Sequence, residues 1–286
     1  MARKLFLFLA FACTLSFVFS QSIEKKRIKL PFPHKGVGRA VQYSVEHPDV
    51  PEAFRGFRIA FVSDIHYASK FKQKHIAALT RTLRFLKPDL VLLGGDYQEG
   101  CDYVEELFDS LASVSAPYGM AAVMGNNDYE RCHDLIVQSM QKRGIVPLEH
   151  KVLPVEKDGK QIYIAGVRNP FDLKNNGVSP AQSCDSAAYV ILLTHTPDYA
   201  QTVDNSRADL ALAGHTHGGQ VAFFGYAPVT ASQYGQRFVR GLSYTDQKVP
   251  VITTNGIGTS RRKIRIGARS EVLLIELSPA TDSNKE

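Results

Sequence analysis

Short apolar segments of this chain repeatedly end in small groups of Gly, Asp, Asn and His residues. In the first half they alternate with stretches whose apolar residues recur every three or four positions, as on one face of a helix. This strand-helix order predicts right-handed crossovers and a sheet with helices on both faces. The predicted strands are 57–63, 90–93 and 120–124, and the predicted helices lie within 76–86 and 104–111.

The second half of the chain is richer in strand patterns than in helix patterns, which favours a second sheet. The connections between these strand patterns are short, and the chain has no internal repeat. The strands are predicted over 162–167, 189–193, 209–213, 220–224, 251–254 and 271–277.

The composition is that of an ordinary globular protein, with 44% hydrophobic and 22% charged residues in 286 positions. It excludes a disordered or collagen-like chain and allows one large α/β domain. The formal net charge of +6 favours anionic partners. Aromatic residues are not interleaved with basic ones over any long stretch, so nucleic-acid binding is not favoured.

The N-terminus has the pattern of a targeting segment. Residues 1–20 join a short basic start to an apolar run that suits a signal peptide, with a membrane anchor as the alternative. Residues 21–41 are rich in basic residues, Pro and Gly, and we predict a tether there. The folded domain is expected over 42–278, followed by a disordered tail over 279–286.

This leader leaves two localisations open. Cleavage before Gln21 exports the protein to the periplasm or cell envelope. Basic residues after the apolar run favour the alternative of an anchor in the inner membrane with the domain on its cytoplasmic face, where they can contact anionic lipids. Beyond the leader lie Cys101, Cys132 and Cys184, so at most one internal disulfide can form, and we expect none to be structural.

Seven side chains with metal-ligand chemistry follow the predicted strands. Asp64 and His66 lie two residues apart, and alternate residues of an extended chain point to the same side. His215 and His217 repeat this spacing between glycines. Because the carboxyl ends of strands form the usual ligand edge of an α/β sheet, we expect a metal site there. The set is completed by Asp96, Asn126 and His195.

This set resembles the motifs of the calcineurin-like metallophosphoesterase superfamily, and the later motifs resemble its bacterial branch of membrane-associated or exported phosphodiesterases. The resemblance covers about Arg55 to Leu277. It implies an α/β fold of the metallophosphoesterase type, a four-layer αββα sandwich with a two-metal site between the sheets. The segments that carry it are Asp64-x-His66, Gly94-Gly95-Asp96, Gly125-Asn126-Asn127-Asp128, His195 and Gly214-His215-Thr216-His217.

The resemblance also implies a division of the ligands between two divalent ions that Asp96 bridges. Nitrogen and oxygen ligands without thiolate suit Mn, Fe or Zn, and Mn is favoured. Two such ions clamp the phosphoryl oxygens, and a hydroxide that bridges them attacks phosphorus. One ion would be held by Asp64, His66, Asp96 and His217, and the other by Asp96, Asn126, His195 and His215.

Asn127 departs from the family pattern, which has histidine at this position. An amide donates a hydrogen bond but releases no proton, so acid assistance to the leaving group, worth about 10²–10⁴ in rate, is missing here. Asp128 or His133 is the candidate replacement. Otherwise the substrate has a good leaving group, such as that of a pyrophosphate, or the site turns over slowly.

The expected function is hydrolysis of a phosphodiester or pyrophosphate bond in a phosphorylated small molecule or lipid-linked substrate, by a monomer. Two alternatives stay open. One is a UDP-2,3-diacylglucosamine pyrophosphatase of lipid A synthesis, which requires a domain on the cytoplasmic face. The other is a catalytically weak, metal-dependent protein that binds phosphate or lipid.

Two further segments near the C-terminus carry unusual side chains. Phe223, Phe224 and Tyr226 are expected in the core, with an acyl or base pocket as the alternative. The basic stretch 261–269 alternates cations with isoleucines, which predicts an edge strand with a cationic outer face. A grip on a second phosphate or a lipid headgroup is its alternative role.

Overall fold

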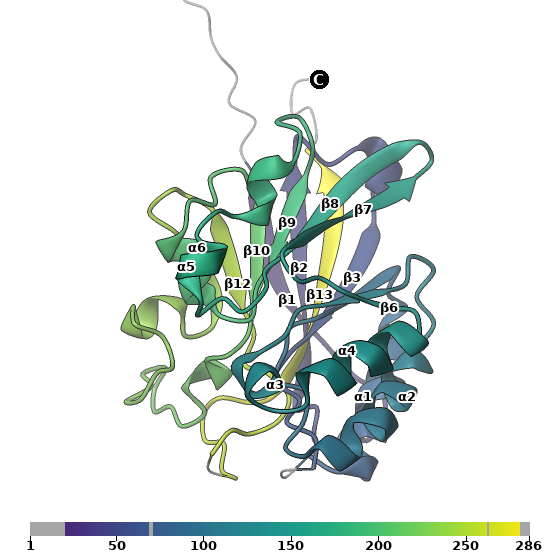
Figure 1. Ribbon diagram of the computed structural model, residues 1–286, viewed down its shortest axis with the longest axis vertical. Helices are drawn as coiled ribbons and strands as arrows, with labels where there is room; N and C mark the ends of the chain where they lie inside the picture. The colour runs from purple at the N-terminus through teal and green to yellow at the C-terminus, as the bar shows by residue number, and fades with distance from the viewer. Residues whose placement is uncertain (1–20, 69–70, 262, 281–286) are drawn as a thin grey trace, which may run out of the picture.

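The computed structural model describes residues 21–280, apart from residues 69, 70 and 262. Two β-sheets pack face to face, with helices α1, α2 and α4 beside one and α5 and α6 beside the other (Figure 1). The predicted leader 1–20 lies outside the described residues, as does the predicted tail from residue 281 onward.

The first sheet has seven strands in the order β1-β2-β13-β3-β4-β5-β6. Strands β3 to β6 run parallel; the alternating pattern predicts β3, β4 and β5, whereas β6 was not predicted. Strand β13 inserts between β2 and β3, parallel to β2 and antiparallel to β3. The strands are β1 (Ser22–Ile28), β2 (Arg39–His47), β3 (Phe57–Val62), β4 (Leu90–Leu93), β5 (Met120–Ala122), β6 (Ile145–Pro147) and β13 (Glu271–Pro279).

The second sheet has six strands in the order β11-β12-β10-β9-β8-β7. Its four inner strands are parallel, and its two edge strands are antiparallel to their neighbours. The strand predicted over 220–224 does not form, because Val221 and Phe223 make only isolated bridges. The strands are β7 (Lys151–Lys157), β8 (Lys160–Gly166), β9 (Val190–Leu193), β10 (Leu210–Ala213), β11 (Gly241–Tyr244) and β12 (Pro250–Thr253).

Helix α1 (Gln73–Leu86) shows how the sequence places a helix. Leu79, Leu83 and Leu86 recur at helical spacing and are buried. The helix ends at Lys87, which has a left-handed φ of 47° and precedes a proline. Within the described part of the chain, no helix has the length and apolar character needed to cross a membrane. The other helices are α2 (Val104–Ala112), α3 (Asn126–Glu130), α4 (His133–Lys142), α5 (Leu173–Asn176) and α6 (Pro197–Thr202), and the 3₁₀ helices are η1 (Glu52–Phe54), η2 (Cys101–Tyr103), η3 (Pro180–Ser183), η4 (His217–Gly219) and η5 (Gly235–Phe238).

Three apolar clusters hold these layers together. One lies between the sheets and includes Phe61 and Ile191, one from each sheet. A second joins the first sheet to α1, α2 and α4, and a third joins the second sheet to α6 through Tyr199. The four-layer αββα sandwich is therefore confirmed. Helices cover only one face of each sheet, so the expectation of helices on both faces of one sheet is wrong, because the other face is buried against the second sheet.

The segment 21–41, predicted to be a tether, is instead part of the fold. Strand β1 pairs with β2 along its whole length, from Ser22 opposite Glu46 to Ile28 opposite Ala40. Its basic residues lie on an edge strand, where charges discourage pairing with other chains. The Pro and Gly residues lie mostly in the connection from β1 to β2, which reaches α1 through a ring contact between Phe32 and Phe85.

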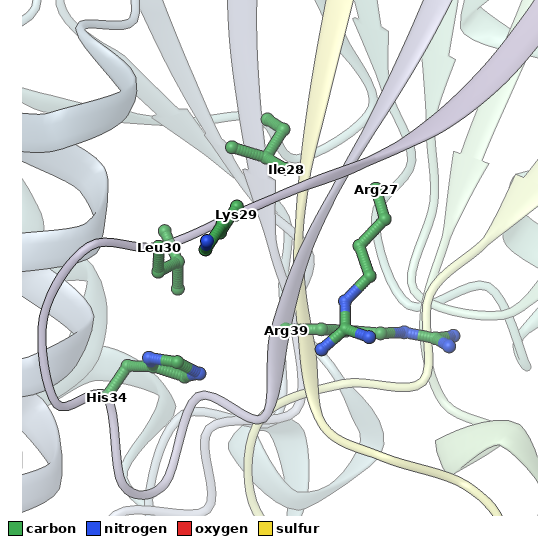
Figure 2. Close-up of a pocket in the computed structure, with 6 residues that line it drawn as sticks. All are labelled: Arg27, Ile28, Lys29, Leu30, His34 and Arg39. Carbon is green, nitrogen blue, oxygen red and sulfur yellow. The ribbon is translucent and has the colours of Figure 1, made fainter.

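A pocket of about 350 Å³ opens between β1 and this connection (Figure 2). Arg39 at its edge also pairs with the buried carboxylate of Glu271. None of the predicted metal ligands lines it, so it is separate from the site described below. Its lining residues are Arg27, Ile28, Lys29, Leu30, His34 and Arg39.

Cys101 and Cys132 form a disulfide, with Cα atoms 5.6 Å apart. The expectation of no structural disulfide is therefore wrong. Cys101 follows the loop that leaves β4, and Cys132 precedes α4 after the loop that leaves β5. The bond thus joins two loops at the carboxyl edge of the first sheet. Cys184 is free.

Candidate metal centre

Each predicted ligand follows the carboxyl end of a strand. In the first sheet these strands are β3, β4 and β5, and in the second sheet they are β9 and β10. Because the two sheets are stacked with these ends together, ligands from both sheets meet at one end of the molecule. In chain order they are Asp64, His66, Asp96, Asn126, His195, His215 and His217.

Six of these ligands form two groups, and the donor atoms within each group lie within 4.8 Å of one another. The Asp96 carboxylate joins the two groups. Its Oδ2 lies 3.5 Å from His66 Nε2 and 3.5 Å from His195 Nε2, which agrees with the bridging place that the resemblance implies. The first group is Asp64, His66 and His217, and the second is Asp96, His195 and His215.

The donors within each group fit a divalent ion. His66 Nε2 lies 3.1 Å from His217 Nε2, and His195 Nε2 lies 3.1 Å from His215 Nδ1. Ring nitrogens that face one another at this distance are the arrangement that a shared cation requires. The buried Asn126 Oδ1 has no hydrogen-bond partner among the described residues, as expected of an oxygen reserved for an ion. Imidazole, carboxylate and amide donors suit Mn, Fe or Zn.

The ligand loops have a strained backbone. The φ angles are positive at Asp64 (54°), His66 (43°), Asp96 (55°), His215 (67°) and His217 (52°). Such conformations cost of order 1–3 kcal/mol each and cluster at functional sites. The expectation that an extended chain aims the two ligands after β3 is therefore wrong. That strand has already ended, and left-handed turns orient the side chains instead.

Two glycines of the motifs allow the loops to approach one another. A Cβ at Gly125 would overlap the Asp96 carboxylate, and a Cβ at Gly214 would overlap Ser63 and the Asp64 carboxylate. No larger residue fits at either position without displacing a ligand.

Hydrogen bonds behind the ligands fix the orientation of three histidines. His66 Nδ1 lies 2.6 Å from Glu99 Oε1, and His195 Nδ1 lies 2.7 Å from the Gly94 carbonyl. Both Nδ1 atoms therefore donate, which leaves Nε2 free to bind an ion. Arg265 Nη2 lies 3.1 Å from His217 Nδ1.

No sequence motif points to Glu99, because an acid three residues after Asp96 fits no ligand spacing. Arg265 belongs to the basic stretch for which a cationic edge strand is predicted. The structure instead shows no strand at Arg265, whose guanidinium donates to the carbonyls of Gly258, His217 and Ala268. Arg265 therefore connects the loop that carries His215 and His217 to the loops around Gly258 and Ala268.

Burial and neighbouring charges set the protonation of the ligands. Burial lowers the pKa of His215 to about 3 and holds the pKa of His217 well below its ordinary value, so both are neutral. Burial opposes protonation of His195, but the Asp96 carboxylate outweighs it and raises the pKa to about 10. Burial also raises the pKa of Asp64. A bound cation would take the place of the proton on His195.

Asn127 lies beside the first ligand group, as predicted. Its Nδ2 lies 3.3 Å from His66 Nδ1 and 3.5 Å from Glu99 Oε1. Its backbone N–H donates to Asp96 Oδ1 at 3.0 Å. The amide thus stands at the edge of the site, where a histidine would stand in the family pattern.

The two predicted replacement acids contact other groups of the protein. Asp128 is fully buried, and its carboxylate accepts three backbone N–H groups from the loops after β4 and β5. These contacts hold the loops together. Burial, and then the neighbouring Asp96 carboxylate, raise the pKa of Asp128 to about 7, and its role as an acid stays a prediction. The ring of His133 lies 3.0 Å from Asp134 Oδ1 and 2.8 Å from Glu149 Oε1, outside both ligand groups.

One wall of the site is apolar. The ring centroid of Phe171 lies 5.1 Å from that of His215 and 6.4 Å from that of His195. Phe171 is half-exposed, so it borders the second ligand group at the surface. No motif pointed to this residue, because its place beside the histidines comes from a loop distant in sequence.

Comparison with known proteins agrees with this geometry. The family model of the calcineurin-like phosphoesterases matches residues 57–219, more than half of the chain. Phosphodiesterase YaeI of Escherichia coli is 31% identical over 234 residues, covering 77% of this chain and 82% of that protein. Uncharacterized protein YpbG of Bacillus subtilis is 30% identical over 223 residues, covering 77% and 80%.

A further relative is the uncharacterized metallophosphoesterase YkuE of Bacillus subtilis, which is 25% identical over 242 residues and covers 82% of this chain and 84% of its own. The matched segment contains every predicted ligand, from the loop after β3 to the loop after β10. The chain therefore belongs to the calcineurin-like phosphoesterase family and is a metal-dependent hydrolase of phosphoester bonds.

Proposed function

We propose that this protein hydrolyses a phosphodiester or pyrophosphate bond with two divalent ions, Mn²⁺ foremost, held in the two ligand groups. The observation that carries the proposal is the position of Asp96 Oδ2, 3.5 Å from a histidine nitrogen of each group. A carboxylate in this place can serve two ions at once. The name of the relative YaeI, a phosphodiesterase, supports the phosphodiester class.

Residues of the protein position the ions and the substrate. Two divalent ions, when bound, neutralise the phosphoryl oxygens and lower the pKa of water toward neutrality. Glu99 holds His66 so that Nε2 faces the site. Asn127 presents its amide at the edge of the site, where it can donate a hydrogen bond to a phosphoryl oxygen.

The substrate that fits best has a good leaving group. Asn127 has no proton to release, Asp128 is occupied by backbone N–H groups, and His133 faces Glu149. A phosphate or an activated alcoholate departs without a proton, whereas a simple alkoxide does not. A pyrophosphate or an activated ester, in a small molecule or a lipid-linked substrate, therefore suits the site better than a dialkyl phosphate.

We also propose that the protein works outside the cytoplasm. The Cys101–Cys132 disulfide favours an oxidising compartment, and the predicted signal peptide agrees with export. A UDP-2,3-diacylglucosamine pyrophosphatase requires the cytoplasmic face, so the disulfide weighs against that alternative. The second candidate, a catalytically weak protein that binds phosphate or lipid, is favoured by Asn127 alone.

The test is hydrolysis of bis-p-nitrophenyl phosphate by protein that has been stripped of metal and then reloaded with Mn²⁺. We expect turnover only after reloading, and we expect Asp96→Ala to lower kcat at least 10³-fold because both ligand groups lose their shared carboxylate. The matched control is Asp134→Ala, which removes an exposed aspartate outside both groups.

Asn127→His tests the role of the leaving group. It should raise turnover of alkyl esters by about 10²-fold and change turnover of p-nitrophenyl esters little, because only the poor leaving group needs a proton. If the wild-type protein is inactive on activated esters and Asn127→His is active, the binding-protein candidate replaces the hydrolase. If Asn127→His leaves alkyl-ester turnover unchanged, the argument from the leaving group is wrong.

A further inference from the structure

Residues 221–227 form a hairpin, here called the apolar hairpin, directly after the ligand loop of His217. The Phe223 N–H donates to the Tyr226 carbonyl at 2.8 Å, and the Tyr226 N–H donates to the Phe223 carbonyl at 2.9 Å. Between them, Phe224 and Gly225 have φ angles of 48° and 89°. Two positive φ angles are the pattern of a type I′ turn.

Phe224 is an unfavourable residue for this turn. Type I′ turns prefer Asn before Gly, because a bulky side chain is strained at positive φ. The side chain of Phe224 gains no compensating burial, since it is fully exposed. A residue that is strained and also exposes a large apolar surface is not explained by the stability of the fold.

The apolar surface extends beyond Phe224. The prediction that Phe223, Phe224 and Tyr226 lie in the core is wrong: Phe223 and Tyr226 are 53% and 60% exposed, and Val229, two residues after the hairpin, is 79% exposed. A Cβ built at Gly225 meets no atom within 4 Å, so the turn projects into open space. Several large exposed apolar side chains on one short turn are typical of an interaction site.

Basic residues contact this hairpin or lie on the segment paired with it. Arg240 Nη2 donates to the Gly225 carbonyl at 2.7 Å. Exposed Arg261 and Lys263 lie on the segment that pairs with the hairpin, where the Ala222 N–H donates to the Ile266 carbonyl. From residue 215 to residue 270 the sequence has one acidic residue, Asp246. Its basic residues there are Arg237, Arg240, Lys248, Arg261, Arg262, Lys263, Arg265 and Arg269.

The apolar hairpin lies at the same end of the molecule as the metal centre. It follows η4, which begins with the ligand His217, and Ala227 packs against Gly219 of that helix. Arg265, which donates to the His217 carbonyl, neighbours Ile266 in the segment paired with the hairpin. The start of β1 and the end of β13 lie at the opposite end of the sheets (Figure 1).

We propose that the apolar hairpin docks the protein on a lipid bilayer with anionic headgroups. Aromatic side chains and cations together are the features that bind the membrane interface, through apolar burial and attraction to anionic lipids. A projecting turn suits insertion between headgroups, whereas a protein partner usually requires a broader surface. The near absence of acids also matches an anionic surface.

This docking places the metal centre at the bilayer surface. The docking proposal extends the proposed function by placing the phosphodiester or pyrophosphate bond in a lipid headgroup. This assignment of the substrate rests on the proposed function. The docking itself needs no turnover, so it can be tested separately from catalysis.

The chain contains no tryptophan, so Phe224→Trp introduces a single indole at the tip of the turn. With the full chain, we expect a blue shift of its emission on vesicles containing phosphatidylglycerol, and quenching by lipids brominated on the acyl chain. Vesicles of phosphatidylcholine alone should give a much smaller shift. The matched control is Phe85→Trp on α1, at a half-exposed phenylalanine outside the hairpin, whose emission should not change.

Phe224→Asn separates binding from folding. Asparagine suits the type I′ turn, so the melting temperature should stay equal or rise, while vesicle affinity should fall about tenfold or more. Hydrolysis of bis-p-nitrophenyl phosphate should be unchanged. The proposal is overturned if the indole emission does not respond to anionic vesicles, or if Phe224→Asn binds them as the wild type does. No response to any vesicle would point to a protein partner instead.

Discussion

Two side chains of the metal centre have roles that the residues next to them in the sequence do not indicate. Asp96 serves both ligand groups because its Oδ2 lies between His66 and His195. Glu99 acts behind a ligand, accepting the Nδ1 proton of His66 at 2.6 Å. A bond of this kind selects the tautomer and makes the other ring nitrogen a better ligand.

Glu99→Gln tests this role. The neutral amide is a weaker acceptor than the carboxylate, so we expect metal affinity to fall about 10–100-fold while the melting temperature of the metal-free protein changes little. Calorimetric titration with Mn²⁺ gives the dissociation constant. Glu130→Gln, at an exposed position on α3, is the control and should bind as the wild type does. Equal affinities for the two variants would show that Glu99 does not position the ligand.

The loops after β4 and β5 form a unit that is cross-linked twice. The buried carboxylate of Asp128 accepts backbone N–H groups from both, and the Cys101–Cys132 disulfide joins them farther along the chain. These loops carry the predicted ligands Asp96, whose backbone is left-handed, and Asn126, which begins helix α3. A strained arrangement persists only when the surroundings determine it from several sides.

Removing the disulfide should loosen this unit. The 31-residue separation predicts a loss of about 3–4 kcal/mol in the free energy of unfolding for Cys101→Ser with Cys132→Ser, because the unfolded chain regains loop entropy. Urea unfolding measures the loss. Cys184→Ser removes the free thiol and serves as the control. A double variant as stable as this control would mean that the cross-link adds nothing to stability.

The whole molecule is built so that the site exists only when both sheets are in place. Ligands after β3 and β4 belong to the first sheet, and those after β9 and β10 belong to the second. The apolar cluster between the sheets, with residues such as Phe61 and Ile191, sets their relative position. Stability and metal binding are therefore coupled throughout the sandwich.

Strand β1 gives a test at this level, because the sequence pattern predicted a tether there. A chain that begins at Gly38 lacks β1 and leaves unpaired those N–H and C=O groups of β2 (Arg39–His47) that face β1, whereas the groups that face β13 keep their partners. We expect a lower melting temperature and concentration-dependent aggregation, as for an uncovered sheet edge. Thermal unfolding with light scattering should be compared with a chain that begins at Gln21. Equal melting temperatures of the two chains would show that β1 contributes nothing to stability, as expected of a tether.

The local pattern of the sequence was enough to predict much of the alternation of strands and helices. The motifs at the strand ends, through their resemblance to a known family, implied the four-layer fold and the ligand residues that the structure brings together. These features depend on periodicity and on short motifs at strand ends, such as Asp64-x-His66, which residues close in sequence carry. The pairing of β1, the disulfide, the contact of Glu99 with His66 and the exposure of Phe224 were decided only by the tertiary structure. Each of these features depends on whether residues distant in the chain come into contact. The packing of the layers determines such contacts, and the sequence pattern of a single segment carries no information about them.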